Sequence, residues 1–274
     1  MGIVNVTPDS FADGGRRLDP DVALADAEAM LADGADLIDV GGESTRPGAP
    51  PLDEAEEWRR IAPVIRGLRQ RTRAPISVDT YKASIAERAI DLGADIVNDV
   101  SALTYDPSLA AVVGRREVAV ILMHNRGRSA DMYAHAEYAD PAAEVASELA
   151  VRDAAAREAG IHADRIILDP GIGFAKRAPH SFAVLAGLPR IAALGRPILC
   201  GPSRKSFLTA AIGQRPPDER VWATAAAVTA SVLLGAHIVR VHDVKEMVDV
   251  VRVADRIAGL PDSMDTSGPR NRKS

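Results

Sequence analysis

Short runs of aliphatic and β-branched residues alternate with longer amphipathic segments along most of the chain. The short runs have the length and composition of buried strands, whereas segments such as DPDVALADAEAMLADG and DEAEEWRRIAPVIRGLRQR have the period of helices. The pattern predicts eight strands, at residues 2–6, 36–41, 75–80, 96–100, 118–124, 165–169, 197–200 and 238–242.

The regular alternation of strands and helices predicts one parallel sheet that is covered by helices. Eight such units in about 260 residues fit a single (β/α)8 barrel better than an open sheet. We therefore expect one α/β barrel domain over residues 1–260, with long loops after the first and second strands. Residues 261–274 are polar and have no periodicity, which predicts a disordered tail.

Composition and charge narrow the class of protein. The chain is 47% hydrophobic and 26% charged, as expected for a protein with a full apolar core. A net charge of −5 and a pI near 5.7 argue against a nucleic-acid partner. The single cysteine, Cys200, excludes an internal disulfide. No signal peptide or membrane-spanning run is present, so we expect a cytoplasmic protein with no membrane partner.

Every predicted strand ends in polar or ionisable residues on the same side of the barrel. One such residue by itself is usually a turn former, a helix cap or a satisfied polar group. Eight at one rim are hard to explain by capping, and the carboxyl ends of the strands carry the active site in barrels of this type. The set comprises Asn5 and the loop NVTPDSFADGG, the loop GGESTRPGA, Asp79, Asn98 with Asp99, His124, Asp169, the run GPSRKSF, and Arg240 with His242.

The segment RIILDPGIGFAK places a carboxylate, Asp169, at the end of an apolar strand, which is costly unless a donor pairs with it. Bases at the same rim, namely Arg46, Lys205 and Arg240, favour an anionic portion of the ligand. Together with Asn5 and His242 they could hold a phosphate or diphosphate, directly or through a divalent ion. The histidines form no zinc motif, and there is no GxxxxGK[ST] loop. The residues alone thus indicate a barrel enzyme for a small, donor-rich, phosphorylated ligand.

Eight segments in order resemble the dihydropteroate synthase family over roughly residues 1 to 260. They are MGIVNVTPDSFADGG, GGESTRPGA, SVDTYK, NDVSA, LMH, LDPGIGFAK, GPSRKSF and RVHDVKEM. The resemblance implies the joining of 6-hydroxymethyl-7,8-dihydropterin diphosphate to 4-aminobenzoate, with release of pyrophosphate assisted by Mg2+. It also implies a dissociative reaction at the pterin methylene, a homodimer, and an enzyme class that sulfonamides inhibit.

The resemblance also implies a role for each rim residue. The pterin ring would contact Asp79, Asn98, Asp169, Lys205 and Arg240. The diphosphate would contact Asn5, Thr45, Arg46, Arg240 and His242, with Asn5 also on the metal. The aminobenzoate would contact Phe11, Thr45, Pro47, Phe174, Lys205 and Ser206. The residues expected to act on the reacting groups are Asp79, Lys205, Arg240 and His242.

Other interpretations remain open at this point. A pterin-binding methyltransferase barrel, a catalytically silent pterin-binding paralogue, and a phosphate-binding aldolase or isomerase would share parts of the pattern. Intact STRP and SRKSF segments count against the methyltransferase, and intact NVTPDSF and SRKSF segments count against the silent paralogue. Lys205 lies in a loop and is a poor candidate for the Schiff-base lysine that an aldolase would want. His124 is interpreted as hydrogen-bonded support more readily than as a base, and Cys200 as a core residue.

The chain departs from the family pattern at a few positions that flank the expected pocket. Asn125 stands where a methionine is common, and Ser181 where an asparagine is common nearby. Ala175, Lys176 and Arg177 stand where the family often has Gly-Lys-Thr. These departures concern the packing of the loops more than catalysis.

Overall fold

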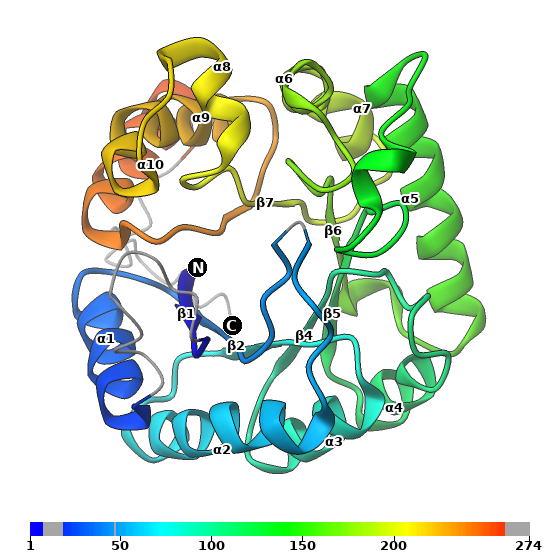
Figure 1. The fold of residues 1–274 in the computed structure, drawn as a ribbon, viewed down its shortest axis with the longest axis vertical. Helices are drawn as coiled ribbons and strands as arrows, with labels where there is room; N and C mark the ends of the chain where they lie inside the picture. Colours follow the sequence, from blue (N-terminus) through cyan, green and yellow to red (C-terminus); the bar gives the residue numbers. More distant parts are fainter. Residues whose placement is uncertain (8–18, 47, 261–274) are drawn as a thin grey trace, which may run out of the picture.

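Eight parallel strands, each followed by helical structure, form the computed structural model, which describes residues 1–7, 19–46 and 48–260 (Figure 1). The strands are β1 Gly2–Asn5, β2 Ile38–Gly41, β3 Ile76–Asp79, β4 Ile96–Asp99, β5 Ala119–Met123, β6 Ile166–Asp169, β7 Leu199–Cys200 and β8 Ile238–Val239. Each lies inside its predicted range. The expected first loop (8–18) and tail (261–274) lie outside the described residues.

The α-helices follow the strands and run around the outside of the sheet (Figure 1). They are α1 Pro20–Ala32, α2 Glu54–Arg71, α3 Ala83–Asp91, α4 Leu109–Arg116, α5 Pro141–Glu158, α6 Ala178–Ala186, α7 Leu188–Ala192, α8 Thr209–Ile212, α9 Val221–Leu233 and α10 Val244–Ile257. Short 3-10 turns are η2 Met132–His135, η3 Ala163–Arg165, η4 Ser206–Leu208 and η5 Pro217–Arg220. Aspartate caps such as Asp19 and Asp53 accept backbone N–H bonds where α1 and α2 begin.

The strands run in chain order around the barrel, with two weak seams. Strands β1 to β6 form one continuous parallel sheet, and β7 pairs with β8. Single bridges connect the two sheets, Leu168 to Ile198 at one seam and Gly2 to Val241 at the other. The amide of Ile3 donates to the carbonyl of Val241 at 3.1 Å, so β1 meets the segment after β8. The expected (β/α)8 architecture is confirmed, with two-residue ladders at β7 and β8.

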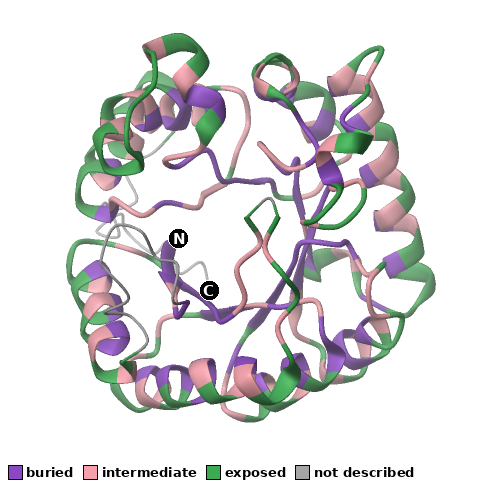
Figure 2. Ribbon diagram, viewed as in Figure 1, coloured by how far each residue is buried: buried purple, intermediate pink, exposed green. Residues whose placement is uncertain are grey.

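The two faces of the strands carry different side chains, as the two-residue period of a strand requires. On β5, Val120 and Leu122 pack in the large core that the helices cover. Ile121 between them points the other way, into a small cluster with Met1, Ile96 and Leu199. Figure 2 shows the corresponding ring of buried residues along the strands. The barrel interior is therefore apolar at these positions, and the same inward period continues into the polar strand ends.

Candidate active site

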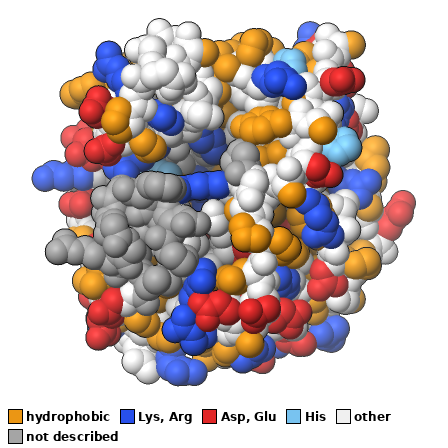
Figure 3. Space-filling view, viewed as in Figure 1, with side chains coloured by type: hydrophobic (Ala, Val, Ile, Leu, Met, Phe, Trp, Pro, Cys, Tyr) orange, Lys and Arg blue, Asp and Glu red, His pale blue; other side chains and the backbone are white. Residues whose placement is uncertain are grey.

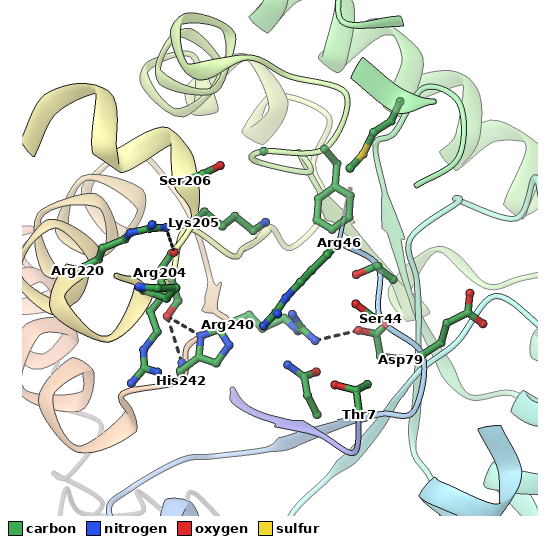
Figure 4. Close-up of a pocket in the computed structure, with 18 of the residues that line it drawn as sticks. Thr7, Ser44, Arg46, Asp79, Arg204, Lys205, Ser206, Arg220, Arg240 and His242 are labelled. Atoms are coloured by element: carbon green, nitrogen blue, oxygen red, sulfur yellow. Dashed lines mark hydrogen bonds and ion pairs between the residues drawn. The ribbon is translucent and has the colours of Figure 1, made fainter. Parts of the chain in front are cut away.

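A cavity of about 570 Å³ opens where the strands end (Figure 4). Nine of the residues expected to bind substrate line it: Asn5, Thr45, Arg46, Asp79, Phe174, Lys205, Ser206, Arg240 and His242. They come from the ends of β1, β3 and β8 and from the loops after β2, β6 and β7. Phe11 and Pro47 lie outside the described residues. The structure thus gathers most of the predicted set, although its members are spread from residue 5 to residue 242.

Asn98 and Asp169 do not line this cavity, because they are buried beside it. Only 4% of Asn98 and 6% of Asp169 is exposed. The Oδ1 atom of Asp169 accepts a hydrogen bond of 2.7 Å from the amide of Gly171. Burial raises the pKa of Asp169, and the nearby charge of Lys205 opposes that rise. Lys205 and Arg240, whose charges both lower the pKa of Asp169, line the cavity next to it.

Arg240 connects three strands at the base of the cavity. Its guanidinium donates to Oδ2 of Asp39 through Nε at 2.7 Å and to Oδ2 of Asp79 at 2.9 Å. Asn98 donates to the same oxygen of Asp39 at 3.1 Å. Asp39 is fully buried, and its Oδ1 atom has no hydrogen-bond partner among the described residues. An unpaired carboxylate oxygen inside a barrel is costly, so this position suits a ligand donor.

Asp79 lines the cavity next to Arg240, from which it accepts a hydrogen bond. Burial raises its pKa to about 7, although the charge of Arg240 acts in the opposite direction. Its ionised form is therefore sensitive to pH near neutrality. A carboxylate that changes charge in this range is typical of functional sites.

Lys205 lies between the turn after β6 and the open cavity. Its Nζ atom donates to the carbonyl of Ile172 and lies 4.7 Å from the centre of the Phe174 ring. Desolvation lowers the pKa of Lys205 to about 8, against the attraction of Asp169. The lysine can thus present its charge both to a ring beside Asp169 and to an anion in the cavity.

The loop after β7 holds His242 at the opposite wall. Ser203 is within 3.0 Å of the ring Nδ1 of His242, and the amide of His242 donates to the hydroxyl of Ser203 at 3.2 Å. Arg204 forms an ion pair with Asp243, with Nε 2.9 Å from Oδ2. Arg220 donates to the carbonyl of Arg204 at 2.8 Å. These contacts fix the orientation of a wall that carries several cations.

Positive charge dominates the cavity. Arg46, Arg204, Lys205, Arg220 and Arg240 all line it, whereas its only acidic lining residues in the described chain are Glu43 and Asp79. Lys and Arg side chains are also visible near the centre of the face in Figure 3. Such an excess of guanidinium and ammonium groups favours a diphosphate over a neutral ligand.

Sequence reasoning missed Asp39, Ser203 and Arg220. Asp39 interrupts the apolar run LIDV at an inward position of its strand, a signal that could have been read from the two-residue period. Ser203 is the first residue of the SRKSF segment, but its bond to His242 cannot be read from the sequence. Arg220 follows an unpatterned loop, and nothing in the sequence marks it.

His124 and Asp99, although at strand ends, serve other purposes. The ring of His124 contacts Glu148 and Lys176 outside the main cavity. Asp99 accepts from the amide and the hydroxyl of Ser101, both at 2.7 Å, and so shapes its own turn. Cys200 is fully buried, and burial raises the pKa of its thiol to about 12, which fits a core residue.

The residues at the mouth could hold Mg2+ only if oxygen atoms of the substrate supply part of its coordination. Among the described residues, no group of three His, Cys, Asp or Glu side chains could hold a metal. Asn5 offers an amide oxygen at the wall of the cationic cavity. Mg2+ commonly keeps several waters and takes its remaining ligands from one or two protein oxygens and from substrate phosphates. That donor set is compatible with Asn5 and a bound diphosphate. In the described chain, no helix is both long and apolar enough to cross a membrane.

The fold and the cavity together define a (β/α)8-barrel enzyme that acts on a small anionic substrate with a buried, donor-rich part. A family model described as pterin binding enzyme matches residues 1–242. The chain therefore belongs to the pterin-binding enzyme family.

Known proteins agree closely with this assignment. A dihydropteroate synthase of Synechocystis sp. is 44% identical over 257 residues, which cover 94% of this chain and 89% of that protein. A Xanthomonas albilineans dihydropteroate synthase solved with 4-aminobenzoic acid is 42% identical, with a TM-score of 0.88 and coverage of 95% and 93%. A Yersinia pestis dihydropteroate synthase solved with a sulfonamide drug complex is 38% identical, with a TM-score of 0.91 and coverage of 94% of each chain.

Proposed function

We propose that the chain catalyses the dihydropteroate synthase reaction, in which 4-aminobenzoate displaces pyrophosphate from 6-hydroxymethyl-7,8-dihydropterin diphosphate. The observation that carries this proposal is the pairing of a buried carboxylate, Asp169, with a cation-rich cavity at the same barrel mouth. Identity to synthases over nearly the whole chain supports the same activity.

Recognition of the pterin would use the buried polar groups beside the cavity. The ring edge that carries N–H donors would bond to Asp169, a geometry that suits a carboxylate. Asn98 would bind the same ring, and Lys205 would donate to its carbonyl and ring nitrogen. Asp39 has a buried oxygen without a partner in the described chain and adjoins Asn98, so it would accept a further ring donor.

Departure of pyrophosphate would depend on the cations of the cavity. The C–O bond at the pterin methylene breaks, and its electron pair leaves with the pyrophosphate. Thr45, Arg46, Arg240 and His242 would stabilise the growing negative charge, while ionised Asp79 would face the cationic methylene. Charges fixed before the reaction lower the barrier because they need no reorganisation when the bond breaks.

The aminobenzoate would enter beside Phe174, with Ser206 and Lys205 near its carboxylate and Thr45 at the wall. Phe11 and Pro47 are expected to complete the slot. The amine lone pair then forms the C–N bond to the methylene, and the amine loses a proton. Exclusion of water is needed at this stage, because water would also react with the cation.

Mg2+ is part of the proposal. Asn5 would hold it together with diphosphate oxygens and water. When bound, the ion would neutralise charge on the leaving group. Removal of Mg2+ with a chelator should abolish turnover and leave binding of the diphosphate-free pterin unchanged.

We propose a homodimer in the cytoplasm as the working form. Among the described residues, five of the seven exposed large hydrophobic side chains fall between residues 222 and 260. They lie on or beside α9 and α10, which pack against each other. A second copy of the chain would cover this apolar surface. The single cysteine suits a reducing compartment.

The rival activities differ in what they require of the site. A corrinoid-linked methyltransferase would need no diphosphate site, whereas five cations line this cavity. An aldolase would need a lysine placed for Schiff-base chemistry, and Lys205 instead bonds to Ile172. A silent paralogue would bind the pterin without turning it over.

One assay tests the proposal. The purified chain is mixed with the pterin diphosphate, 4-aminobenzoate and Mg2+, and pyrophosphate and dihydropteroate are measured. We expect both products in equal amounts. Asp169→Ala should lose pterin binding, because the ring donors lose their charged acceptor. Asn5→Ala and His242→Ala should chiefly lower kcat. Pterin binding without any turnover would favour the silent paralogue.

A further inference from the structure

We infer that Lys176 is a positioning residue for this reaction: a relay of Glu148 with the buried His124 and Lys176 fixes the turn that presents Asp169 and Phe174 to the substrates. The inference rests on the proposed function, because that function is what assigns Asp169 and Phe174 to the substrates. Glu148, His124 and Lys176 do not line the cavity themselves.

The side-chain nitrogen of Lys176 bonds to the turn after β6 and to His124 at the end of β5. Lys176 is 1% exposed. Its Nζ atom lies 3.1 Å from the carbonyl oxygen of Gly171, 2.9 Å from that of Phe174 and 2.8 Å from Nδ1 of His124. The carbonyl oxygen of His124 is also 3.5 Å from Nζ, so this nitrogen donates to acceptors on the turn and on His124. Burial lowers the pKa of Lys176 well below its ordinary value, and the charge of Asp169 acts in the opposite direction.

Glu148 and Lys176 together define the tautomer of His124. The hydrogen bond to His124 lowers the pKa of Glu148 to about 2, so the carboxylate is ionised and Nε2 carries the ring proton, which leaves Nδ1 to accept from Lys176. That Nε2 lies 3.0 Å from Oε2 of Glu148, which accepts the proton. Desolvation lowers the pKa of His124 to about 4, in keeping with a neutral ring. Arg126 forms an ion pair with Glu148 and holds the outer end of the relay.

The turn needs this support because its backbone is strained. Gly171, Gly173 and Ala175 have φ of 65°, 84° and 48°, all in the left-handed region. Ala175 is the costly member, since a side chain in this region adds about 1–2 kcal/mol. Lys176 bonds to carbonyls on both sides of Gly173, and therefore ties together the ends of the strained segment.

The relay fixes the positions of the two residues proposed to contact the substrates, Asp169 and Phe174. The amide of Gly171 donates to Oδ1 of Asp169 and so sets the direction of the carboxylate. Phe174 presents its ring to the cavity one residue before the strained Ala175. Lys205 holds the same turn from the cavity side through the carbonyl of Ile172. The turn is thus gripped between two lysines, of which only Lys205 lines the cavity.

Binding of the diphosphate-free ring, 6-hydroxymethyl-7,8-dihydropterin, measured by calorimetry, tests the inference. Lys176→Met should weaken ring binding by about tenfold to a hundredfold, because a small displacement of the acceptor is enough for such a loss. KM for the pterin diphosphate should rise by a similar factor, with a smaller change in kcat. Arg177→Met removes an exposed cation one residue further on and should change affinity by less than about twofold.

A second pair of variants covers the case in which Lys176→Met does not fold. His124→Asn keeps a side-chain oxygen near the place of Nδ1 and should retain most of the ring affinity. His124→Leu removes that acceptor and should lose affinity as Lys176→Met does. Wild-type affinity in folded Lys176→Met, or equal affinities in the two His124 variants, would overturn the inference. Absence of turnover by the wild-type chain would refute the proposed function instead.

Discussion

At the scale of single residues, the site depends on ionisable side chains whose pKa values are shifted from their ordinary values by burial in the fold. Asp79 and Lys205 face one cavity, and burial acts on both in the direction of the neutral form. Arg240 lies between the two carboxylates of Asp39 and Asp79, so its charge is engaged before substrate arrives. A reaction that separates opposite charges needs such groups in their ionised forms.

The pH dependence of kcat/KM should therefore be bell-shaped. The pKa of Asp79 is about 7, so kcat/KM should rise as pH increases through 7 and the carboxylate ionises. The pKa of Lys205 is about 8, so kcat/KM should fall as pH increases through 8 and the ammonium loses its proton. Steady-state rates across this range measure both limbs.

Asp79→Asn provides the control for that profile. The variant should be slower and should lose the acid limb, because the amide does not titrate. A wild-type profile that stays flat well above pH 8 would contradict the role of Lys205.

At the scale of elements, the turn after β6 shows how a short glycine motif places a carboxylate. Gly171 has φ of 65°, and a Cβ atom there would overlap the carbonyl oxygen of His124. Only glycine permits β6 to turn this close to the end of β5. The amide of Gly171 also donates to Asp169. This one glycine therefore allows the close packing of the turn against His124 and sets the direction of the Asp169 carboxylate.

Gly171→Ala should therefore destabilise the protein by about 3 kcal/mol or more and weaken pterin binding. Gly195→Ala is the matched control, because Gly195 also has a positive φ, 71°, but no described atom lies within 4 Å of the place that a Cβ would take. The control should lose only about 1–2 kcal/mol, the cost of the left-handed backbone. Urea unfolding of both variants measures the difference, and similar losses would show that the close contact relaxes cheaply.

At the scale of the whole molecule, most of the exposed large apolar side chains of the described residues lie on or beside α9 and α10. Val253 and Ile257, one turn apart on α10, are 60% and 66% exposed, and Leu233 at the end of α9 is 44% exposed. Isolated exposed apolar residues are ordinary, but a cluster on neighbouring helices is typical of an interface. This surface is where we expect a second copy to bind.

Introducing charge into that surface should separate the dimer. The double variant Val253→Asp and Ile257→Asp should elute as a monomer in size-exclusion chromatography with light scattering, because the aspartates cannot be buried without partners. Val151→Asp, at a residue that is 55% exposed on α5, should remain a dimer. A double variant that stays dimeric would move the interface elsewhere.

The sequence by itself determined the strand order, the barrel and the rim residues. This was possible because the two-residue period of strands and the polar endings of apolar runs are local signals. The family segments added roles for residues such as Asp169 and Lys205. Those roles stay predictions, although the structure places most of the residues around one cavity.

The tertiary structure alone decided which of these groups bond to one another. Arg240 bonds to Asp39, 201 residues earlier in the chain, and Lys176 to His124, 52 residues earlier. No local pattern encodes such contacts, because they follow from how strands line up around the barrel and how far burial displaces each pKa. The burial of Asp169 has the same origin, since solvent access is a property of the assembled mouth and not of any one segment.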